Sequence, residues 1–454
     1  MIFKNHIWKT LFFCFLGFTA VLFSCSDDES SSVTEEDKTL VISTNINSLT
    51  FEDTELGSNS NRNFSLQYAN LNTPIKITTM GDFKIGFDLE NLSQSIDISN
   101  EDKETTKTIY VQFTPTQTGI QNSELKIVNG DEFEKIITLQ AKGKEKTITM
   151  STFSDKRVAF GNGHDQSAVQ SFDFPTDIDK VSQIKMFVKL RCPAGGCDEW
   201  DVFANVKVKD PATGEFYEMG RFITPYWNDN SQLPRGFEYD VTDFKSLLTG
   251  NNELRIRTEC WNSKGYLVSV EFDFIYGTPD YKYSAIVPII AYDDWSSSGV
   301  PYGKAHNFDL DKSVSIPNEA EKIHLRSTIS GWGHATPYDS GGRGCAEWCY
   351  RTHYIKINGT QKYTHDMGPI GCAQNPVSNQ EPGNWKPDRA GWCPGMEVPI
   401  RIDEMESTWA GQSFNFEYDY ENWTNNGANG DAFYATNTFV VVQSNNPISP
   451  AIVN

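Results

Sequence analysis

The chain has 454 residues, with 39 lysines and arginines against 60 aspartates and glutamates, so its formal net charge is −21 at pH 7. Charged residues make up 22% and aromatic residues 13%, which excludes a wholly disordered chain, and the length suggests about three domains. The acidic balance, without clusters of Lys and Arg, also argues against a nucleic-acid partner.

Residues 1–24 are typical of a secretory signal, because two lysines precede an apolar stretch that is short for a membrane-spanning helix. The run Leu-Phe-Ser before Cys25 resembles a bacterial lipoprotein cleavage site. It predicts a lipid on Cys25 and an outer-membrane or cell-surface location. An uncleaved anchor, or an ordinary signal that leaves a periplasmic or secreted protein, is the alternative. Residues 25–37 are rich in Ser, Asp and Glu and predict a flexible tether.

Residues 38–147 form a block of predicted short strands that lie between Asn, Gly, Asp and Pro turns, for example at 41–44, 107–113 and 134–139. The run VQFTPTQTG followed by LKIVNG resembles the late strands of immunoglobulin-like sandwiches. The block has no Cys, Trp or His. We therefore interpret it as an immunoglobulin-like β-sandwich module that serves as a spacer or a docking unit.

Two further all-β blocks are expected at 148–283 and 284–454, separated by a turn-rich segment, and blocks of this size suit sandwiches or jelly rolls. The sequence Cys-Asp-Glu-Trp in the first block is echoed by Cys-Ala-Glu-Trp in the second, which is weak evidence for a duplication. The expected strands of the first block are 183–190, 202–208, 253–261 and 267–276.

Seven cysteines remain after the signal and the lipid site, and in an exported protein closely spaced pairs predict disulfides. Nearest-neighbour pairing leaves Cys260 unpaired, but six cysteines allow fifteen connectivities. A zinc site built from cysteines with His334 or His353 is the alternative. The nearest-neighbour pairs are Cys192 with Cys197, Cys345 with Cys349, and Cys372 with Cys393.

Three carboxylates, Asp201, Glu259 and Glu347, lie within two residues of a tryptophan. The period of two along a strand places Asp201 opposite the apolar face that begins at Val202, and it places Glu259 opposite a buried Cys260. Tryptophan faces cover the C–H faces of sugars, and a carboxylate beside an indole is partly desolvated, which raises its pKa. Any one of them taken alone is more simply an ordinary surface acid.

No Gly-x-Ser-x-Gly elbow, phosphate-binding loop or His-Glu-x-x-His motif is present in the sequence. His334, in the run SGWGHA, could act as a base. A structural or sugar-contacting role is favoured, because no Ser or Cys nucleophile lies nearby in the sequence. The residue pattern alone therefore favours carbohydrate chemistry carried by carboxylates.

The segments that carry these residues belong to a longer series that spans about 148–450 and resembles the peptide-N4-(N-acetyl-β-glucosaminyl)asparagine amidase F (PNGase F) family. The series includes IKMF, CDEWD, GRFITPYW, DVTDFKSLL, YGTPDYKYSA, TISGWGHA, RGCAEWC and PDRAGWCPGM. The resemblance implies two adjacent eight-stranded antiparallel jelly rolls with the active site between them. It implies an amidase that cleaves the β-aspartylglucosamine bond of N-linked glycoproteins or glycopeptides, releases the intact glycan as a glycosylamine and converts Asn to Asp.

The resemblance also implies roles for individual residues. Asp201 is then the principal acid/base, Glu347 orients water or sugar, and Glu259 helps to anchor the sugar pair. It implies the three nearest-neighbour disulfides and neither a metal nor another cofactor. The substrate contacts that it implies are Trp200, Trp261, Trp332 and Arg389.

Two positions depart from the family pattern. Val202 stands where the family has Arg, so a charged sugar contact is missing and the preference for particular core sugars is open. Cys260 replaces a Thr on the face that is expected to be buried. An endoglycosidase that cleaves the chitobiose core is one alternative, and a non-catalytic glycan-binding surface lipoprotein is another. We expect a monomer that acts on N-glycosylated proteins and reaches the membrane through its lipid.

The charge and the aromatic residues are distributed differently along the chain. Residues 25–147 carry 11 basic and 21 acidic side chains, a net charge of −10, and no tryptophan. Ten of the eleven tryptophans lie between 200 and 423, several beside the acids of interest. The distribution predicts a sugar-binding cleft in the C-terminal blocks and an acidic N-terminal module without a site of its own.

Overall fold

The computed structural model describes residues 39–103, 105–381 and 383–454, so the expected signal peptide, the tether and Cys25 lie outside the described residues. Within these ranges the chain is built from short strands joined by loops and by five 3-10 helices. None of the helices described there is long and apolar enough to span a bilayer. The 3-10 helices are η1 (Ile178–Lys180), η2 (Thr242–Phe244), η3 (Ser296–Ser298), η4 (Cys372–Gln374) and η5 (Ser407–Trp409).

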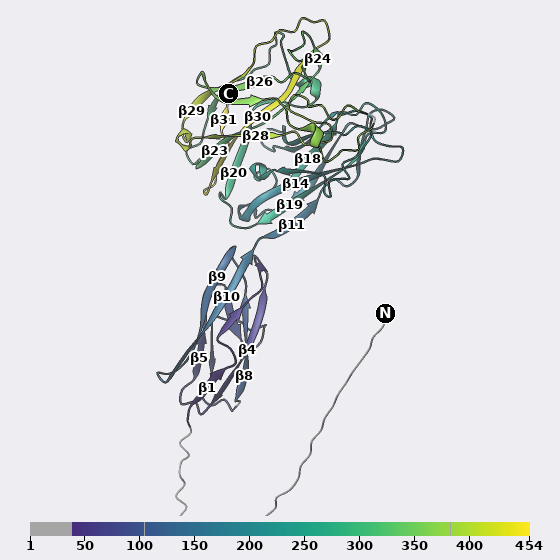
Figure 1. Ribbon diagram of the computed structural model, residues 1–454. Helices are drawn as coiled ribbons and strands as arrows, with labels where there is room; N and C mark the ends of the chain where they lie inside the picture. Colours follow the sequence, from purple (N-terminus) through teal and green to yellow (C-terminus); the bar gives the residue numbers. More distant parts are fainter. Residues whose placement is uncertain (1–38, 104, 382) are drawn as a thin grey trace, which may run out of the picture.

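The N-terminal part is a sandwich of two sheets, drawn at the bottom of Figure 1. One sheet has the order β1–β4–β8–β6, and the other has the order β2–β10–β9–β5–β7 with β3 beside β10. The sandwich encloses its own apolar core. Its immunoglobulin-like class stays a prediction. The strands are β1 (Val41–Thr44), β2 (Ser48–Thr50), β3 (Thr54–Glu55), β4 (Ser60–Ala69), β5 (Ile75–Thr78), β6 (Phe83–Gly86), β7 (Ser95–Ile98), β8 (Thr106–Phe113), β9 (Gly119–Asn129) and β10 (Phe133–Lys144).

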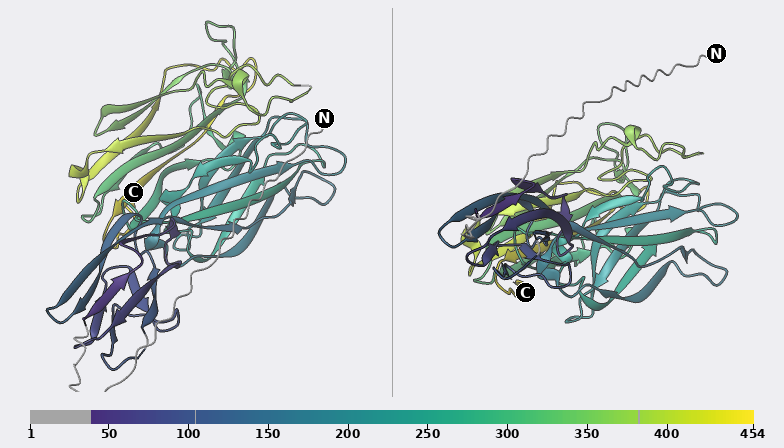
Figure 2. Two further views of the ribbon diagram at one scale, coloured as in Figure 1. Left: turned by 60° about the horizontal axis from the view of Figure 1, so that its bottom comes forward. Right: turned by 90° about the horizontal axis from the view of Figure 1, so that it is seen from below.

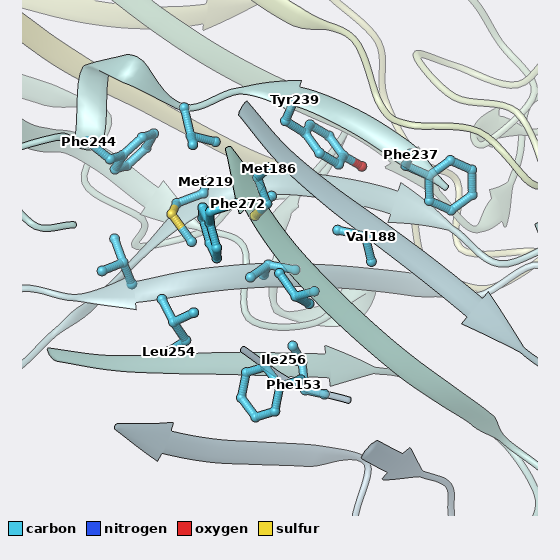
Figure 3. Packing of buried hydrophobic residues seen from close by; sticks show 14 of the residues in the cluster. Phe153, Met186, Val188, Met219, Phe237, Tyr239, Phe244, Leu254, Ile256 and Phe272 are labelled. Carbon is cyan, nitrogen blue, oxygen red and sulfur yellow. The ribbon is translucent and has the colours of Figure 1, made fainter. Parts of the chain in front are cut away.

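The next strands form the first jelly roll, which is antiparallel throughout. Its sheets have the orders β11–β19–β14–β17, with the short β12 beside β19, and β13–β18–β15–β16. Phenylalanine, leucine, valine and methionine side chains from both sheets meet between them (Figure 3). The strands are β11 (Lys146–Ser151), β12 (Lys156–Val158), β13 (Ser167–Phe174), β14 (Val181–Arg191), β15 (Phe203–Lys209), β16 (Phe216–Ile223), β17 (Phe237–Asp240), β18 (Gly250–Thr258) and β19 (Tyr266–Tyr276).

The second jelly roll lies beside the first in both views of Figure 2. Its sheets have the orders β20–β30–β23–β28, with β21 beside β30, and β27–β26–β29–β22–β31. The two rolls confirm the predicted all-β jelly-roll fold. The strands are β20 (Tyr283–Tyr292), β21 (Val300–Pro301), β22 (Asp311–Ser315), β23 (Lys322–Trp332), β26 (Thr352–Ile357), β27 (Thr360–Asp366), β28 (Ile400–Met405), β29 (Ser413–Tyr420), β30 (Phe433–Ser444) and β31 (Ile452–Val453), and β24 (His334–Ala335) pairs with β25 (Cys345–Ala346).

The two rolls pack against each other, and strands at their interface are buried on both of their faces. In β30 the side chains of Phe439 and Val441 join the core of the first roll, whereas Val440 and Val442 join the core of the second. A strand covered on both faces has a nearly continuous apolar sequence, which is the pattern of this Phe-Val-Val-Val run.

Backbone hydrogen bonds also cross the interface. The N–H of Ile223, at the end of β16, donates to the carbonyl of Met396 at 2.9 Å, and the N–H of Gly395 donates to the carbonyl of Ile223 at 3.0 Å. The N–H of Val398 donates to the carbonyl of Arg221 at 2.8 Å. A segment of the second roll thereby covers the edge of a sheet of the first, so that this edge is not left unpaired.

A buried ionic network lies at the centre of the interface. The ammonium of Lys207 in β15 donates to Asp293 Oδ1 at 2.5 Å, and the two side chains are 3% and 2% exposed. Glu218 in β16 pairs with Arg221 at 3.0 Å. The amide of Asn437 in β30 donates to Glu218 at 2.9 Å and to Asp293 at 2.8 Å. Each buried charge therefore has a partner, and several of the partners belong to the opposite roll.

We predict that Lys207→Met lowers the free energy of unfolding by about 3–5 kcal/mol, because it leaves the buried Asp293 carboxylate without its cation. The exposed Lys185–Glu238 pair on the first roll is the matched control. Lys185→Met should cost less than about 1 kcal/mol, since surface pairs contribute little. Chemical denaturation followed by circular dichroism measures both, and equal effects of the two substitutions would contradict the importance of the network.

Candidate active site

Asp201 lies in the loop that leads into β15. The N–H of Val202 donates to the hydroxyl of Thr224 at 2.9 Å, and that hydroxyl donates to the carbonyl of Trp200 at 2.8 Å. These bonds attach the loop to the residue that follows β16. The Trp200 ring is left half exposed, whereas the Asp201 carboxylate is mostly buried.

The Asp201 carboxylate faces Arg389 of the second roll. Arg389 Nη2 donates to Asp201 Oδ2 at 3.1 Å and to the hydroxyl of Tyr226 at 3.1 Å. The guanidinium is fully buried, and its carbon lies 4.4 Å from the centroid of the Trp348 ring. Burial raises the pKa of Asp201 to about 6, although the Arg389 charge and the Tyr226 hydrogen bond both act to lower it. Asp201 therefore exchanges its proton close to neutral pH, as a general acid or base requires.

Glu259 directly follows β18 in the first roll. Its carboxylate contacts the start of η3, which belongs to the second roll. The Ser296 N–H donates to its Oε2 at 3.2 Å, and the Ser296 hydroxyl donates to its Oε1 at 3.0 Å. Burial raises the pKa of Glu259, and the two bonds from Ser296 oppose that shift. Cys260, the next residue, points into the apolar core of the first jelly roll, as the period of two predicts.

Glu347 lies between the bonded Cys345 and Cys349, so its backbone is held by a short loop. Its carbonyl accepts the Ala390 N–H at 2.7 Å, which places it next to Arg389, and its Oε1 lies 3.9 Å from Arg389 Nε. Its Oε2 lies 2.9 Å from His334 Nε2, and this hydrogen bond raises the pKa of His334. Glu347 therefore lies next to Arg389, which in turn is hydrogen-bonded to Asp201.

A cavity of about 370 Å³ opens between the rolls in front of these groups. Most of its exposed lining is apolar, which suits the C–H faces of sugars. Trp332 stacks on Trp392 with ring centroids 4.5 Å apart, and its indole N–H donates to Ser330 at 2.9 Å, so this wall is held in place. The lining residues are Trp200, Asp201, Val202, Phe203, Glu259, Trp261, Ser296 and Trp332.

The structure brings together most of the residues that the sequence singles out. Asp201, Glu259 and three of the named tryptophans line one cavity, and Arg389 and Glu347 lie behind Asp201. Arg389 differs from the expectation of a substrate contact, because its side chain is fully buried against Asp201, Tyr226 and Trp348.

Sequence reasoning missed Tyr226 and Ser296, whose side chains contact Arg389 and Glu259. Tyr226 lies in the run GRFITPYW, but nothing there shows that its hydroxyl faces Arg389. Ser296 is one of three consecutive serines, and its contact with Glu259 arises only when the rolls pack together.

The cysteines form the three nearest-neighbour disulfides, Cys192–Cys197, Cys345–Cys349 and Cys372–Cys393. The zinc alternative does not fit, because the sulfur atoms of these six residues are bonded to each other rather than free as thiolates. Cys260 is free and buried, and burial raises the pKa of its thiol, which makes it inert at neutral pH.

Comparison with known proteins agrees with this geometry. Residues 302–444 match the family model described as "Peptide-N-glycosidase F, C terminal". The chain is 58% identical over 309 residues to peptide-N(4)-(N-acetyl-beta-D-glucosaminyl)asparagine amidase F of Elizabethkingia miricola, over 68% of this chain and 87% of the relative.

Solved structures give the same result. The structure of PNGase F, a glycosylasparaginase from Flavobacterium meningosepticum, matches with a TM-score of 0.67 and 58% identity over 68% of this chain and 99% of that chain. PNGF-II matches with a TM-score of 0.53 and 12% identity over 86% of this chain and 91% of its own, which supports the fold alone. On the identity and the coverage of the amidase relative, the chain belongs to the peptide-N-glycosidase F family.

Proposed function

We propose that this protein hydrolyses the amide bond between an asparagine side chain and the innermost N-acetylglucosamine of an N-linked glycan. The observation that carries the proposal is the Asp201 carboxylate, which is desolvated to a pKa of about 6 at the end of an aromatic cavity. The family relatives, which are named as amidases of this class, support the choice of bond.

The reaction requires one base and one water molecule. Asp201, when ionised, accepts a proton from water as the water oxygen bonds to the amide carbon. The bond from that carbon to the sugar-linked nitrogen then breaks, and the proton passes from Asp201 to the leaving amine. The products are an aspartate side chain and a glycosylamine, so every atom of water is accounted for. Arg389 supports the base role, because its charge favours the ionised form of Asp201.

The other residues take positioning and binding roles in the proposal. Glu347, beside Arg389 and His334, orients the attacking water or the sugar. Glu259, held by Ser296, accepts hydrogen bonds from sugar hydroxyls, and Trp200, Trp261 and Trp332 cover the sugar faces. Arg389 orients Asp201 from behind rather than contacting the substrate.

We propose the division of the chain as a module at 38–147 and two jelly rolls at 148–283 and 284–454. The three largest apolar clusters, each centred in one part, support this division. The three disulfides support an exported protein, because disulfides persist in oxidising compartments. We further propose a signal peptide at 1–24, a lipid on Cys25 and a cell-surface location, which would place the enzyme near external glycoproteins.

For the proposed function, the first prediction concerns the reaction product. After digestion of a defined N-glycopeptide in ¹⁸O-labelled water, mass spectrometry should show aspartate with one ¹⁸O atom at the glycosylation site. An endoglycosidase would instead leave asparagine bearing one N-acetylglucosamine, and a binding protein would leave the glycopeptide intact. Asp201→Asn should lower the rate by about 10²–10⁴-fold, the range of general acid–base catalysis.

Glu199→Gln is the matched control for that substitution. Glu199 is a neighbouring carboxylate that does not line the cavity, so its removal should leave the rate unchanged. Circular dichroism of both variants tests whether the fold is intact. A folded Asp201→Asn variant with undiminished activity would overturn the mechanism.

The second prediction is a pH dependence. Because Asp201 must be ionised to accept a proton and its pKa is raised to about 6, kcat/KM should fall as the pH drops through about 6 and should level off above it. Steady-state rates on a glycopeptide across acidic and alkaline buffers measure the profile, with circular dichroism at each pH to detect unfolding. A rate that declines as the pH rises through about 6 would make Asp201 the acid and contradict the base role.

The third prediction concerns the membrane anchor. If Cys25 carries the lipid, cells that express the full chain and are fed labelled palmitate should yield labelled protein in the membrane fraction. Cys25→Ser should abolish the label and shift the protein to a soluble fraction, whereas Cys14→Ser, within the signal segment, should not. Label on the Cys25→Ser variant would contradict the assignment.

A further inference from the structure

Three large indole rings are exposed on loops of the first jelly roll. Trp200 is 52% exposed, Trp227 is 41% exposed and Trp261 is 68% exposed, and Trp200 and Trp261 line the cavity itself. Exposed indoles have little packing to hold them, so some other interaction must fix the loops that carry them. These loops lie far apart in the sequence.

A single buried residue, Asp198, holds all three loops, two through its carboxylate and one through its backbone carbonyl. Its Oδ1 accepts the N–H of Trp200 at 3.2 Å, and its Oδ2 accepts the N–H of Trp261 at 2.9 Å and that of Asn262 at 3.3 Å. Its backbone carbonyl accepts the N–H of Trp227 at 3.2 Å. Asp198 thus bonds to the main chain of each of the three tryptophans.

The carboxylate is fully buried, and the hydrogen bonds to its oxygens come from the backbone N–H groups of Trp200, Trp261 and Asn262. A buried carboxyl group is costly unless its hydrogen bonds are all made, so the loss of one of these bonds destabilises the loops that donate them. The adjacent Cys192–Cys197 disulfide and the bond from the Asp198 N–H to the carbonyl of Gly265 at 3.3 Å fix the position of Asp198 itself.

The backbone of Trp227 is held in an unusual conformation. Its φ of 55° lies in the left-handed region, which is rarely occupied by a bulky residue, and its ring packs against the ammonium of Lys264 at 4.4 Å. Such backbone conformations persist when the surroundings over-determine them, and they gather at functional sites. The bond to the carbonyl of Asp198 is part of those surroundings.

We propose that Asp198 is a positioning residue for substrate binding, which sets the aromatic rim formed by Trp200 and Trp261. This inference rests on the proposed function. Asp198 does not line the cavity, and it has no direct contact with Asp201, Glu347 or Arg389 among the hydrogen bonds of the site. Its role is therefore to shape the rim on which sugar faces stack, and the proton transfers do not depend on it.

The test is Asp198→Asn, which replaces one accepting oxygen by an NH₂ group that faces backbone N–H donors. KM for a glycopeptide should rise about tenfold, the effect expected from the loss of a hydrogen bond to a charged group, while kcat stays within about twofold. The Kd for free N,N′-diacetylchitobiose, measured by tryptophan fluorescence without any turnover, should rise by the same factor.

A double-mutant cycle separates positioning from a general structural effect. In a chain that already carries Trp200→Ala and Trp261→Ala, Asp198→Asn should cause no further change in KM, because the rings that it positions are absent. A tenfold rise in that background as well would overturn the proposal. Fluorine NMR of 5-fluorotryptophan-labelled protein should show displaced or broadened Trp200 and Trp261 signals in Asp198→Asn.

Asn252→Asp is the matched control, because Asn252 is also buried in the first roll and also bonds to three backbone groups, away from the cavity. It should lower stability without a change in KM. Asp198→Ser, which keeps an accepting oxygen, is the second variant if Asp198→Asn does not fold. If neither variant folds, Asp198 acts on stability rather than on the rim, and the proposal is wrong. A wild-type protein without amidase activity would overturn the proposed function, whereas an active wild type with an unchanged KM in Asp198→Asn would overturn this inference alone.

Discussion

The buried ionic network between the two jelly rolls is the constraint on which the site depends. Lys207 and Glu218 come from the first roll, and Asp293 and Asn437 come from the second. Two rolls joined by apolar contacts alone could slide, because hydrophobic packing has little directional preference. Paired buried charges penalise any displacement that leaves one of them without its partner, so the network selects one arrangement.

That arrangement is what buries Asp201 beside a cation. Asp201 belongs to the first roll and Arg389 to the second, and neither roll alone would bury the carboxylate or supply its cation. The network also extends to the wall of the cavity. Arg221 donates to the hydroxyl of Ser330 at 2.9 Å, and the same hydroxyl accepts the indole N–H of Trp332 at 2.9 Å. The contact that aligns the rolls therefore also fixes an aromatic surface of the site.

Residue patterns predict the strands well because alternation is a local property. The segments expected at 41–44 and 267–276 agree closely with β1 and β19, and the buried face that contains Cys260 follows from the period of two. The same alternation does not reveal that β15 is covered on both faces. Asn205 and Lys207 look like the solvent side of a strand, yet both are buried, because their partners lie on a different roll more than 80 residues away.

The site shows the same division between local and non-local information. The acids beside tryptophans can be read from the sequence, whereas the contacts of Tyr226 and Ser296 form only across the interface. The echo between the two Cys-x-Glu-Trp runs shows how a local pattern can mislead. In the second run the glutamate, Glu347, reaches the site, whereas in the first it is Asp198 that holds the loops, and Glu199 does not line the cavity.

Val202 connects the electrostatics of the site to the lining of its cavity. It is buried beside Asp201 and lines the cavity, so it adds to the apolar surroundings that raise the pKa of that carboxyl. A cation at this position would act as Arg389 does and favour the ionised form at lower pH. An apolar residue therefore leaves the effect of burial on the pKa of Asp201 unopposed at this position, and it presents an apolar surface to the cavity. One side chain thus contributes both to the pKa of Asp201 and to the shape of the cavity, so a substitution of Val202 alters both.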